Sequence, residues 1–457
     1  MSLKPRISKG TRDFNSQEIA DREYVFEIIK KNFQLYGYKP IETPSFELRE
    51  NLLGKYGVDA DRLVFKILNS GEKLRNADLS ALEENLLTKF SNSLSEKALR
   101  YDLTVPLARY VSQNQNEIIF PFKRYQIQPV WRADRPQKGR FQEFYQCDAD
   151  LIGSDSLWPE IEFIKLFDSV FTDLKLGAVN LKINNRKILY SISELISIND
   201  RFSEFTSILD KIDKIGIEEA KKLILLAGIS NEKFKKIEFL FLKDISVTDR
   251  ILNLKSLLSN SKIGTEGISE IEFIFNTIDQ LNLKTISLEL DLTLARGLNY
   301  YTGTIFEAVS NTIEIGSIAA GGRYDDLTSI FGLNNISGVG ISFGLDRILF
   351  LLKEQGLLPQ KNDDKIKVMF TNFGNKESLF SYNAIMKLRE KGIVCELYPN
   401  NSKLKKQISY ANKKGIPFIV LVGENELYMR KYTLKNMLNG SQKTIDLQAL
   451  ISSFTKK

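Results

Sequence analysis

The sequence of 457 residues predicts an α+β protein: an antiparallel sheet flanked by helices, with a helical insertion and a C-terminal α/β domain. Two strand patterns rich in aromatic and apolar residues follow each other at residues 122–132 and 141–152, and the short loop between them predicts a hairpin. Residues 187–281 change to a helical spacing of Ile, Leu, Lys and Glu. From residue 366 onward, short apolar strands alternate with helices, which is typical of a small α/β domain.

The composition excludes several kinds of site. The chain contains no histidine, which excludes His-dependent catalytic triads, His-ligated metals and a His-based pH switch. Cys147 and Cys395 can build neither a disulfide framework nor a four-cysteine zinc site, so we expect no metal bound by His or Cys. No apolar run approaches the ~18 residues of a membrane span, and residues 1–6 lack the apolar core of a signal peptide. We therefore expect a cytoplasmic protein with reduced cysteines and no membrane partner.

A long amphipathic helix is predicted over residues 16–36. Asn15 and Glu18 form a capping-box pattern at its start, and Gly37 is typical of a helix end. The next segment, residues 39–44, is extended but interrupted by two prolines. Because proline cannot donate a ladder hydrogen bond, we expect this segment at a sheet edge or at an interface.

Pattern and charge divide the chain into segments. We predict a first part of the main domain at 1–186, a helical insertion at 187–281, a second part at 282–354, a linker at 355–365 and a terminal α/β domain at 366–457. The chain is about three times the ~150 residues that serve as a prior for one domain. Residues 365–457 carry 17 basic and 6 acidic residues, whereas the whole chain has a net charge of +7. This basic end favours a polyanionic partner; a solvated lysine-rich surface is the other interpretation.

The strand predicted at 141–152 is unusually polar on one face. Because side chains alternate along a strand, five residues point the same way: Gln142, Phe144, Gln146, Asp148 and Asp150. A buried face with amides and carboxylates needs polar partners or a polar ligand, whereas a solvated face would need neither. If the hairpin forms, Arg132 lies close to the surface around Gln146 and Asp150. Arginine and carboxylates in one cleft suit a zwitterionic substrate with a phosphate beside it.

The common phosphate-binding motifs are missing from the sequence. No G-x-x-x-x-G-K-[ST] pattern occurs, and the glycines at 338–344 do not fit a dinucleotide fingerprint. A nucleotide would therefore have to be held in another way, by arginines on a sheet. Residues 100–106 and 294–303 each combine a charge, a hydroxyl and a turn residue or helix breaker, and together they begin to outline a site.

Taken in order, these segments resemble the histidyl-tRNA synthetases, a family of class II aminoacyl-tRNA synthetases. Residues 124–150, with R-x-D-R-P-Q-K-G-R and F-Y-Q-C-D-A-D, resemble motif 2 of that class. L-A-R-G-L-x-Y-Y-T-G at 294–303 is similar to a signature of the histidyl enzymes, except that Asn299 stands where they often have Asp. Residues 10–13 with Pro44 resemble the family's start and motif 1, and residues 340–347 resemble motif 3. The implied fold is the class II antiparallel sheet, with an anticodon-binding domain at the C-terminus.

The resemblance implies a binding site for L-histidine. It would be formed by six residues: Asp102, Thr104, Gln146, Asp150, Tyr300 and Tyr301. The first two would receive the α-ammonium group, and Gln146 would orient the backbone portion of the amino acid. Asp150 and Tyr300 would bind the imidazole nitrogens, and Tyr301 would help to wall that pocket.

The resemblance also implies sites for ATP and tRNA. Arg132 would bind the α-phosphate, and Arg347 would lie against the far end of the nucleotide. Arg296 would stabilise charge on the oxygens around the α-phosphorus, so Arg296 and Arg132 are the expected catalytic residues. Three residues of the motif 2 loop would contact the acceptor end of the tRNA: Arg135, Gln137 and Lys138. ATP with Mg²⁺, a histidine tRNA and a second copy of the chain are the implied cofactors and partners.

The sequence therefore predicts a histidine–tRNA ligase that forms histidyl-adenylate and then transfers histidine to the 3′ end of its tRNA. A synthetase for another amino acid is one alternative, and Asp150 with the segment 294–303 argues against it. A regulatory paralogue that binds metabolites without charging tRNA is the other. Such paralogues tend to lose active-site residues and the terminal domain, both of which are present in this chain.

Overall fold

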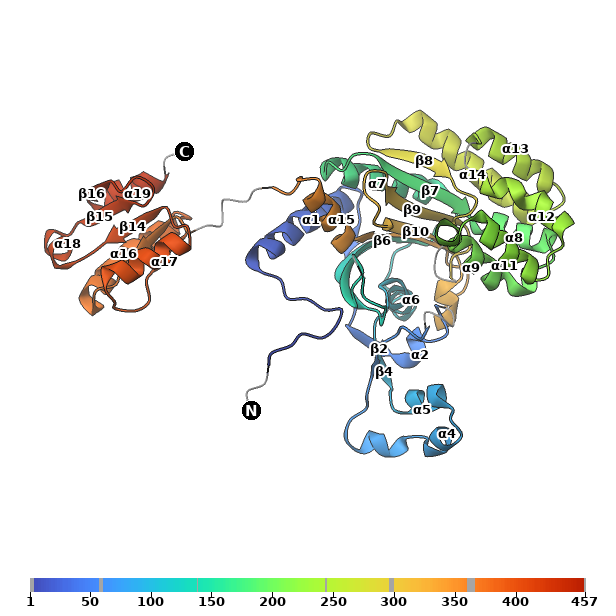
Figure 1. Cartoon of the computed structure of the whole chain (residues 1–457), viewed down its shortest axis with the longest axis horizontal. Coiled ribbons are helices and arrows are strands. Elements are labelled where there is room, and N and C mark those ends of the chain that lie inside the picture. The colour runs from blue at the N-terminus through green and yellow to red at the C-terminus, as the bar shows by residue number, and fades with distance from the viewer. Residues whose placement is uncertain are drawn as a thin grey trace. The chain divides into compact units, whose positions relative to one another are not determined.

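The structure is a computed structural model that describes residues 4–56, 61–137, 139–242, 245–295, 300–359 and 366–455. The chain forms two compact units, Met1–Leu358 and Pro359–Lys457 (Figure 1). Hydrophobic clusters lie within each unit. Among the described residues, we find no helix long and apolar enough to cross a membrane.

The first unit is built on a mixed, mostly antiparallel sheet of eight strands within the described residues. Their order across the sheet is β1 (Lys39–Pro40), β5 (Phe122–Trp131), β6 (Glu143–Ile152), β11 (Gly338–Gly344), β10 (Ser317–Tyr324), β9 (Thr304–Ser310), β7 (Val179–Asn185) and β8 (Ile286–Leu290). The predicted hairpin is confirmed, because β5 and β6 pair antiparallel from Phe122–Ile152 to Trp131–Glu143. The proline-interrupted segment is also confirmed at an edge, where β1 pairs with β5.

Three helices pack against the central strands of this sheet: α1 (Ser16–Leu35), α7 (Trp158–Asp173) and α15 (Leu345–Glu354) (Figure 1). The rings of Phe33 and Phe167 lie with their centroids 6.0 and 5.3 Å from that of Phe343 on β11. Cys147, Ala149 and Leu151 of β6 point into the same cluster. The alternate side chains of β6 are therefore turned to the opposite face.

The predicted capping box at the start of α1 is present. The side chain of Asn15 accepts a hydrogen bond from the backbone N–H of Glu18 at 3.0 Å, and the Glu18 carboxylate accepts one from the Asn15 N–H at 2.9 Å. Two orphan N–H groups of the first turn are thereby satisfied. The helix ends before Gly37, which adopts a positive φ of 82°.

The described residues between β7 and β8 are helical. They form α8 (Arg186–Leu195), α9 (Phe202–Asp210), α10 (Ile212–Ile215), α11 (Ile217–Leu226), α12 (Asn231–Ile237), α13 (Val247–Leu257) and α14 (Lys262–Leu281), with two 3-10 turns at Asn199–Arg201 and Glu238–Phe241. Helix α14 contacts α8, α7 and β7. The apolar residues of this helical segment join the main cluster of the first unit.

A smaller lobe precedes the hairpin. It contains a sheet in the order β2 (Phe46–Leu48), β4 (Lys97–Leu99) and β3 (Lys66–Ile67), with α2 (Arg49–Leu52), a 3-10 turn (Gly71–Asn76), α4 (Leu79–Glu83) and α5 (Leu87–Ser93). Helix α6 (Thr104–Gln113) follows and packs on a 3-10 turn at Leu327–Phe331. The start of α6 thus comes within reach of the polar face of β6.

The second unit is a five-stranded sheet, counted over its described residues. The order is β13 (Cys395–Leu397), β12 (Val368–Phe370), β14 (Phe418–Leu421), β15 (Tyr432–Asn436) and β16 (Gln442–Ile445), with helices α16 (Asn375–Glu390), α17 (Leu404–Lys413), α18 (Glu424–Met429) and α19 (Leu447–Thr455) (Figure 1). The first three strands are parallel, and β15 and β16 are antiparallel to their neighbours. The alternating pattern predicted up to β14 is confirmed, whereas the elements after it were not predicted.

Candidate active site

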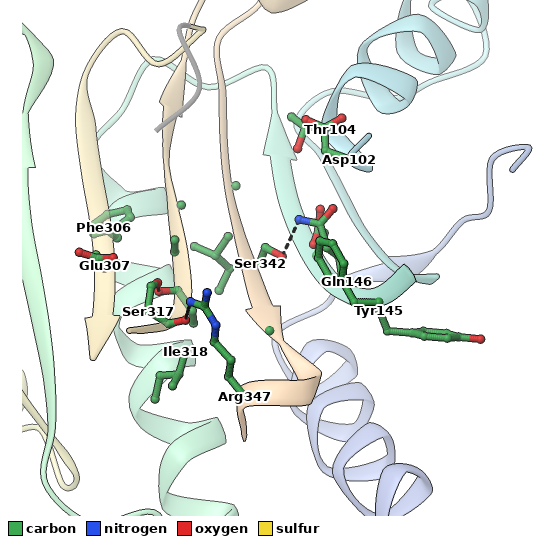
Figure 2. A pocket seen from close by; sticks show the side chains of 18 of the residues that line it. Asp102, Thr104, Tyr145, Gln146, Phe306, Glu307, Ser317, Ile318, Ser342 and Arg347 are labelled. Atoms are coloured by element: carbon green, nitrogen blue, oxygen red, sulfur yellow. Dashed lines mark hydrogen bonds between the residues drawn. The ribbon is translucent and has the colours of Figure 1, made fainter. Parts of the chain in front are cut away.

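A cavity of about 310 Å³ lies on the polar face of β6 in the first unit. Eight of the residues that the sequence singled out line it: Asp102, Thr104, Arg132, Gln146, Asp150, Tyr300, Tyr301 and Arg347. Figure 2 shows Asp102 and Thr104 toward one end of this view and Arg347 toward the other, with Gln146 and Ser342 between them. The cavity therefore has an acidic end and an end that carries a guanidinium group.

The loop between β5 and β6 carries the residues expected to meet tRNA. Arg135 and Gln137 are exposed and do not line the cavity, and Gln137 is bridged to Arg140 across the loop. Lys138 and Arg296 lie outside the described residues.

Asp102 is held just before α6. One carboxylate oxygen accepts hydrogen bonds from the Tyr56 hydroxyl at 2.9 Å and from the Val105 N–H at 3.1 Å, and the other accepts one from Tyr300 at 3.4 Å. The N-terminus of a helix favours a carboxylate there. Burial raises the pKa of Asp102, although these hydrogen bonds and Arg132 partly oppose the rise.

Asp150 is paired with Arg124 of the neighbouring strand. Their register places them opposite each other, and the guanidinium lies 2.6 Å from one carboxylate oxygen. The other oxygen accepts a hydrogen bond from the Tyr324 hydroxyl at 2.5 Å. A Cβ atom at Gly340 would lie 1.9 Å from this carboxylate, so only glycine fits beside it. Burial raises the pKa of Asp150, and the charge of Arg124 acts against that rise.

Gln146 and Asp148 lie on the same face of β6 as Asp150 and also line the cavity. The amide of Gln146 donates to the Ser342 hydroxyl at 3.2 Å (Figure 2). Burial, reinforced by the charges of Asp150 and Asp102, raises the pKa of Asp148 to about 7, while Arg124 and Ser342 act in the opposite direction. The sequence pattern placed Asp148 on this face but gave it no role.

Two arginines also line the cavity, and the charge of one of them, Arg132, acts on Asp102. The guanidinium of Arg132 lies over the ring of Tyr101 at 4.2 Å and donates to the Tyr101 carbonyl at 3.0 Å. Arg347 donates to the carbonyl of Ser317 on β10. Both guanidinium groups are thus oriented by backbone carbonyls at the wall of the cavity.

Sequence reasoning missed several residues that line the cavity: Asp134, Arg140, Glu307 and Asp346. Phe144, which the alternation along β6 predicts on this face, lines the cavity as well. Arg140 pairs with Asp134 at 3.2 Å, and Asp346 contacts Arg12 at 2.5 Å. The first contact lies within the hairpin loop, whereas the second joins segments far apart in the sequence, which no local pattern predicts.

The described residues contain no group of three or more acidic or cysteine side chains that could hold a metal ion by themselves. Glu307 is a single buried carboxylate that lines the cavity on β9. In Figure 2 it lies beside Phe306 and near Ser317 and Arg347. One carboxylate fits a Mg²⁺ ion that also binds substrate phosphates and retains water.

Two family models match most of the chain. The one described as histidyl-tRNA synthetase matches residues 72–348, and the one described as anticodon binding domain matches residues 372–457. Together they cover the cavity and the second unit.

Curated and solved proteins agree with these matches. The chain is 54% identical to the histidine–tRNA ligase of Christiangramia forsetii, over 98% of this chain and 99% of that protein. It is similar to the crystal structure of histidyl-tRNA synthetase from a Nostoc species, with a TM-score of 0.75, 29% identity and 99% of each chain covered. It also shares its fold with a Bacillus halodurans protein described as an ATP phosphoribosyltransferase regulatory subunit/histidyl-tRNA synthetase, at 18% identity, a TM-score of 0.68 and 90% and 97% coverage.

Proposed function

The chain belongs to the histidyl-tRNA synthetase family, and from this premise we propose that it is a histidine–tRNA ligase with its active centre in the cavity on β6. It activates L-histidine with ATP, forming histidyl-adenylate and pyrophosphate, and transfers histidine to the 3′ end of its tRNA. The observation that carries this proposal is a single cavity lined by both carboxylates and arginines. Such a cavity suits an amino acid with two basic groups beside a nucleotide phosphate.

The acidic end would bind the amino acid. Asp102 and Thr104 would receive the α-ammonium group, and Gln146 would orient the backbone portion. Asp150 and Tyr300 would bind imidazole nitrogens beside the wall formed by Tyr301. The buried oxygen of the Gln146 amide has no hydrogen-bond partner among the described residues, which supports its use for a ligand.

The reaction needs positioning and charge stabilisation rather than a proton shuttle. The carboxylate of histidine attacks the α-phosphorus, and the bond to the pyrophosphate oxygen breaks in line. Arg132 would bind the α-phosphate, and Arg296, proposed from its sequence position, would stabilise the charge on the surrounding oxygens. Arg347 would lie against the far end of the nucleotide. The cation–π contact with the ring of Tyr101 helps to hold the guanidinium of Arg132 at the wall of the cavity.

Magnesium fits this site as a partner of ATP. Glu307 would hold it together with the phosphate oxygens, and when bound it would neutralise charge on the leaving pyrophosphate. The carboxylate is on β9, whose neighbour β10 provides the Ser317 carbonyl that Arg347 contacts.

The remaining parts would serve the second half-reaction and assembly. Arg135, Gln137 and Lys138 would contact the acceptor end of the tRNA, and residues 366–457 would bind its anticodon region. The enzyme would act in the cytoplasm as a homodimer, with the edge strand β1 and helix α1 near the subunit interface. The catalytic domain would comprise 1–186 and 282–354, with 187–281 as a helical insertion.

Amino-acid-dependent exchange between ATP and pyrophosphate tests this function. The full-length protein is assayed with each of the twenty amino acids, and histidine alone should drive exchange. Equal exchange with another amino acid would contradict the assignment. No exchange with any amino acid, in a protein that still binds histidine, would favour the regulatory paralogue.

A further inference from the structure

Asp148 has a buried carboxylate oxygen that the site as described does not use. It lies at the centre of β6, opposite Gln126 of β5 and Ser342 of β11 in the sheet register. The residue is 2% exposed and lines the cavity. Its Oδ1 atom accepts no hydrogen bond from the described residues. Because a buried carboxylate oxygen without a partner is costly, this atom indicates a ligand that carries a donor.

The three aspartates of the cavity differ in how they are satisfied. Both oxygens of Asp102 accept hydrogen bonds from the protein. Asp150 has Arg124 on one oxygen and Tyr324 on the other. Asp148 interacts with the Ser342 hydroxyl, and no ion pair joins it to a cation in the described part of the chain. Of the three, Asp148 therefore has the most unused capacity to accept from a ligand.

The groups that face Asp148 come from every neighbouring element: Arg124 and Gln126 from β5, Asp150 from its own strand, Ser342 from β11, Arg100 and Asp102 from the segment before α6, and Tyr301. The guanidinium groups of Arg124 and Arg100 are buried near these carboxylates, and the charge of Arg132 also acts on Asp102. Neither buried guanidinium forms an ion pair with Asp148 in the described part of the chain, so its Oδ1 atom can accept from a protonated nitrogen of a ligand.

We propose that Asp148 is a second imidazole-binding carboxylate, which shares one proton with the ring of bound histidine. The inference rests on the proposed function, because it takes histidine as the occupant of the cavity. Asp150, held by Arg124 and Tyr324, then keeps a fixed charge, whereas Asp148 adjusts its protonation to the ring. Asp148 acts here as a specificity-determining residue in addition to those named above.

The proposal fixes how many protons histidine binding moves at each pH. In the empty site the Asp148 carboxyl has a pKa of about 7, and a free imidazole has one of about 6.5. At pH 6 both groups are mostly protonated, so forming a pair with one shared proton releases roughly 0.7 proton. At pH 8 both have mostly lost their protons, so binding takes up roughly 0.9 proton. Histidine affinity should therefore be greatest near pH 7 and fall on both sides.

Titration calorimetry on the full-length protein measures this directly. Histidine is titrated at pH 6, 7 and 8, each in two buffers with different heats of ionisation, and the difference gives the protons exchanged. We expect release at pH 6, a small uptake of roughly 0.3 proton at pH 7 and a larger uptake at pH 8. Proton uptake or no proton exchange at all three pH values, in a protein that binds histidine normally, would overturn the inference. Because this measurement uses the parent protein, it does not depend on the folding of a variant.

The variant Asp148→Asn then tests whether the exchanged proton belongs to the Asp148 carboxyl group. Loss of the charge-assisted hydrogen bond should weaken histidine binding about ten- to hundred-fold at pH 7, and the release at pH 6 should disappear. Asp200→Asn is the matched control, because Asp200 is an exposed residue on the 3-10 turn Asn199–Arg201 and lies outside the cavity. Circular dichroism checks that both variants fold.

The outcomes separate this inference from the proposed function. If Asp148→Asn releases as many protons at pH 6 as the parent, Asp148 is a structural residue and the inference is wrong, while the function stands. If the parent protein does not bind histidine at all, the proposed function itself fails. The inference is supported if Asp148→Asn no longer releases protons on histidine binding at pH 6, while Asp200→Asn releases as many as the parent protein.

Discussion

The two compact units use their charged residues in opposite ways. In the first unit, Arg124 is completely buried and Asp150 is 2% exposed, so each depends on the other and on the sheet register that brings them together. In the second unit, Lys405 and Lys406 are exposed along α17. Buried charges respond strongly to the loss of one partner, whereas exposed charges are screened by salt and act almost independently. From the proposed function we therefore expect histidine recognition to depend on geometry and tRNA binding to depend on the number of exposed charges.

The largest effect should come from the buried ion pair. Arg124→Met leaves Asp150 without its ion-pair partner, and the free energy of unfolding should fall by about 3–5 kcal/mol. The double variant Arg124→Met/Asp150→Leu should recover much of this loss, because neither charge remains buried. Urea unfolding measures the free energy of unfolding of the single and the double variant. Lys405→Ala is the comparison at an exposed position, and it should change this free energy by less than about 0.5 kcal/mol. Equal stability of the single variant and the parent would contradict the contrast between the units.

Arg296→Ala should slow adenylation far more than it weakens histidine binding. Removing one donor that acts on transition-state charge typically costs about 10²–10³ in kcat. Single-turnover formation of histidyl-adenylate measures the rate, and equilibrium titration measures histidine affinity. A rate within a few-fold of the parent would show that this residue does not have the proposed role.

Asp150→Asn should weaken histidine binding about ten- to hundred-fold while leaving ATP binding almost unchanged. The amide keeps the shape of the side chain but lacks the charge that faces the ligand and Arg124. Titrations with histidine and with ATP measure the two affinities on the same preparation. An unchanged histidine affinity together with a lower melting temperature would mean that Asp150 serves only to neutralise Arg124.

Part of this site could be predicted from local patterns, and its other residues were assigned through the resemblance to the family. The alternation along β6 placed Gln146, Asp148 and Asp150 on one face, and the hairpin brought Arg132 to the same cavity. The ion-pair partner of Asp150 was not identified in advance, although counting the hairpin register from its loop would have placed Arg124 opposite it. That count requires the pairing of the two strands to be known.

Other features could not be predicted because they depend on distant segments. Tyr56 and Tyr324 reach Asp102 and Asp150 from outside the recognised motifs. Strand β10 was not predicted, because its sequence contains two glycines, which have low strand propensity. Its glycine at position 321 is explained by close packing, because a Cβ atom there would lie 2.2 Å from the Gly340 carbonyl oxygen. Tertiary contact thus overrides local preference.

Substitutions of the exposed lysines of α17 should have small and additive effects on tRNA binding. Lys405→Ala and Lys406→Ala should each reduce the slope of log affinity for tRNA against log salt by about 1. Lys235→Ala and Lys236→Ala make a matched pair of exposed neighbouring lysines on α12 in the first unit, which should leave the slope unchanged. Filter binding across a salt series compares them. The same reduction in both pairs would show that the second unit has no special share in tRNA binding.

Removing the second unit tests the central claim most directly, namely that the first unit alone contains the chemistry of histidine activation. The fragment 1–358 keeps every residue assigned to adenylation, so its histidine-dependent pyrophosphate exchange should match that of the full chain. Its tRNA binding should be weaker and should depend less on salt. Sedimentation and circular dichroism establish that the fragment is folded and has the same subunit composition as the parent. A folded fragment that has lost exchange, or one that binds tRNA with the affinity and salt slope of the full chain, would contradict this division of function.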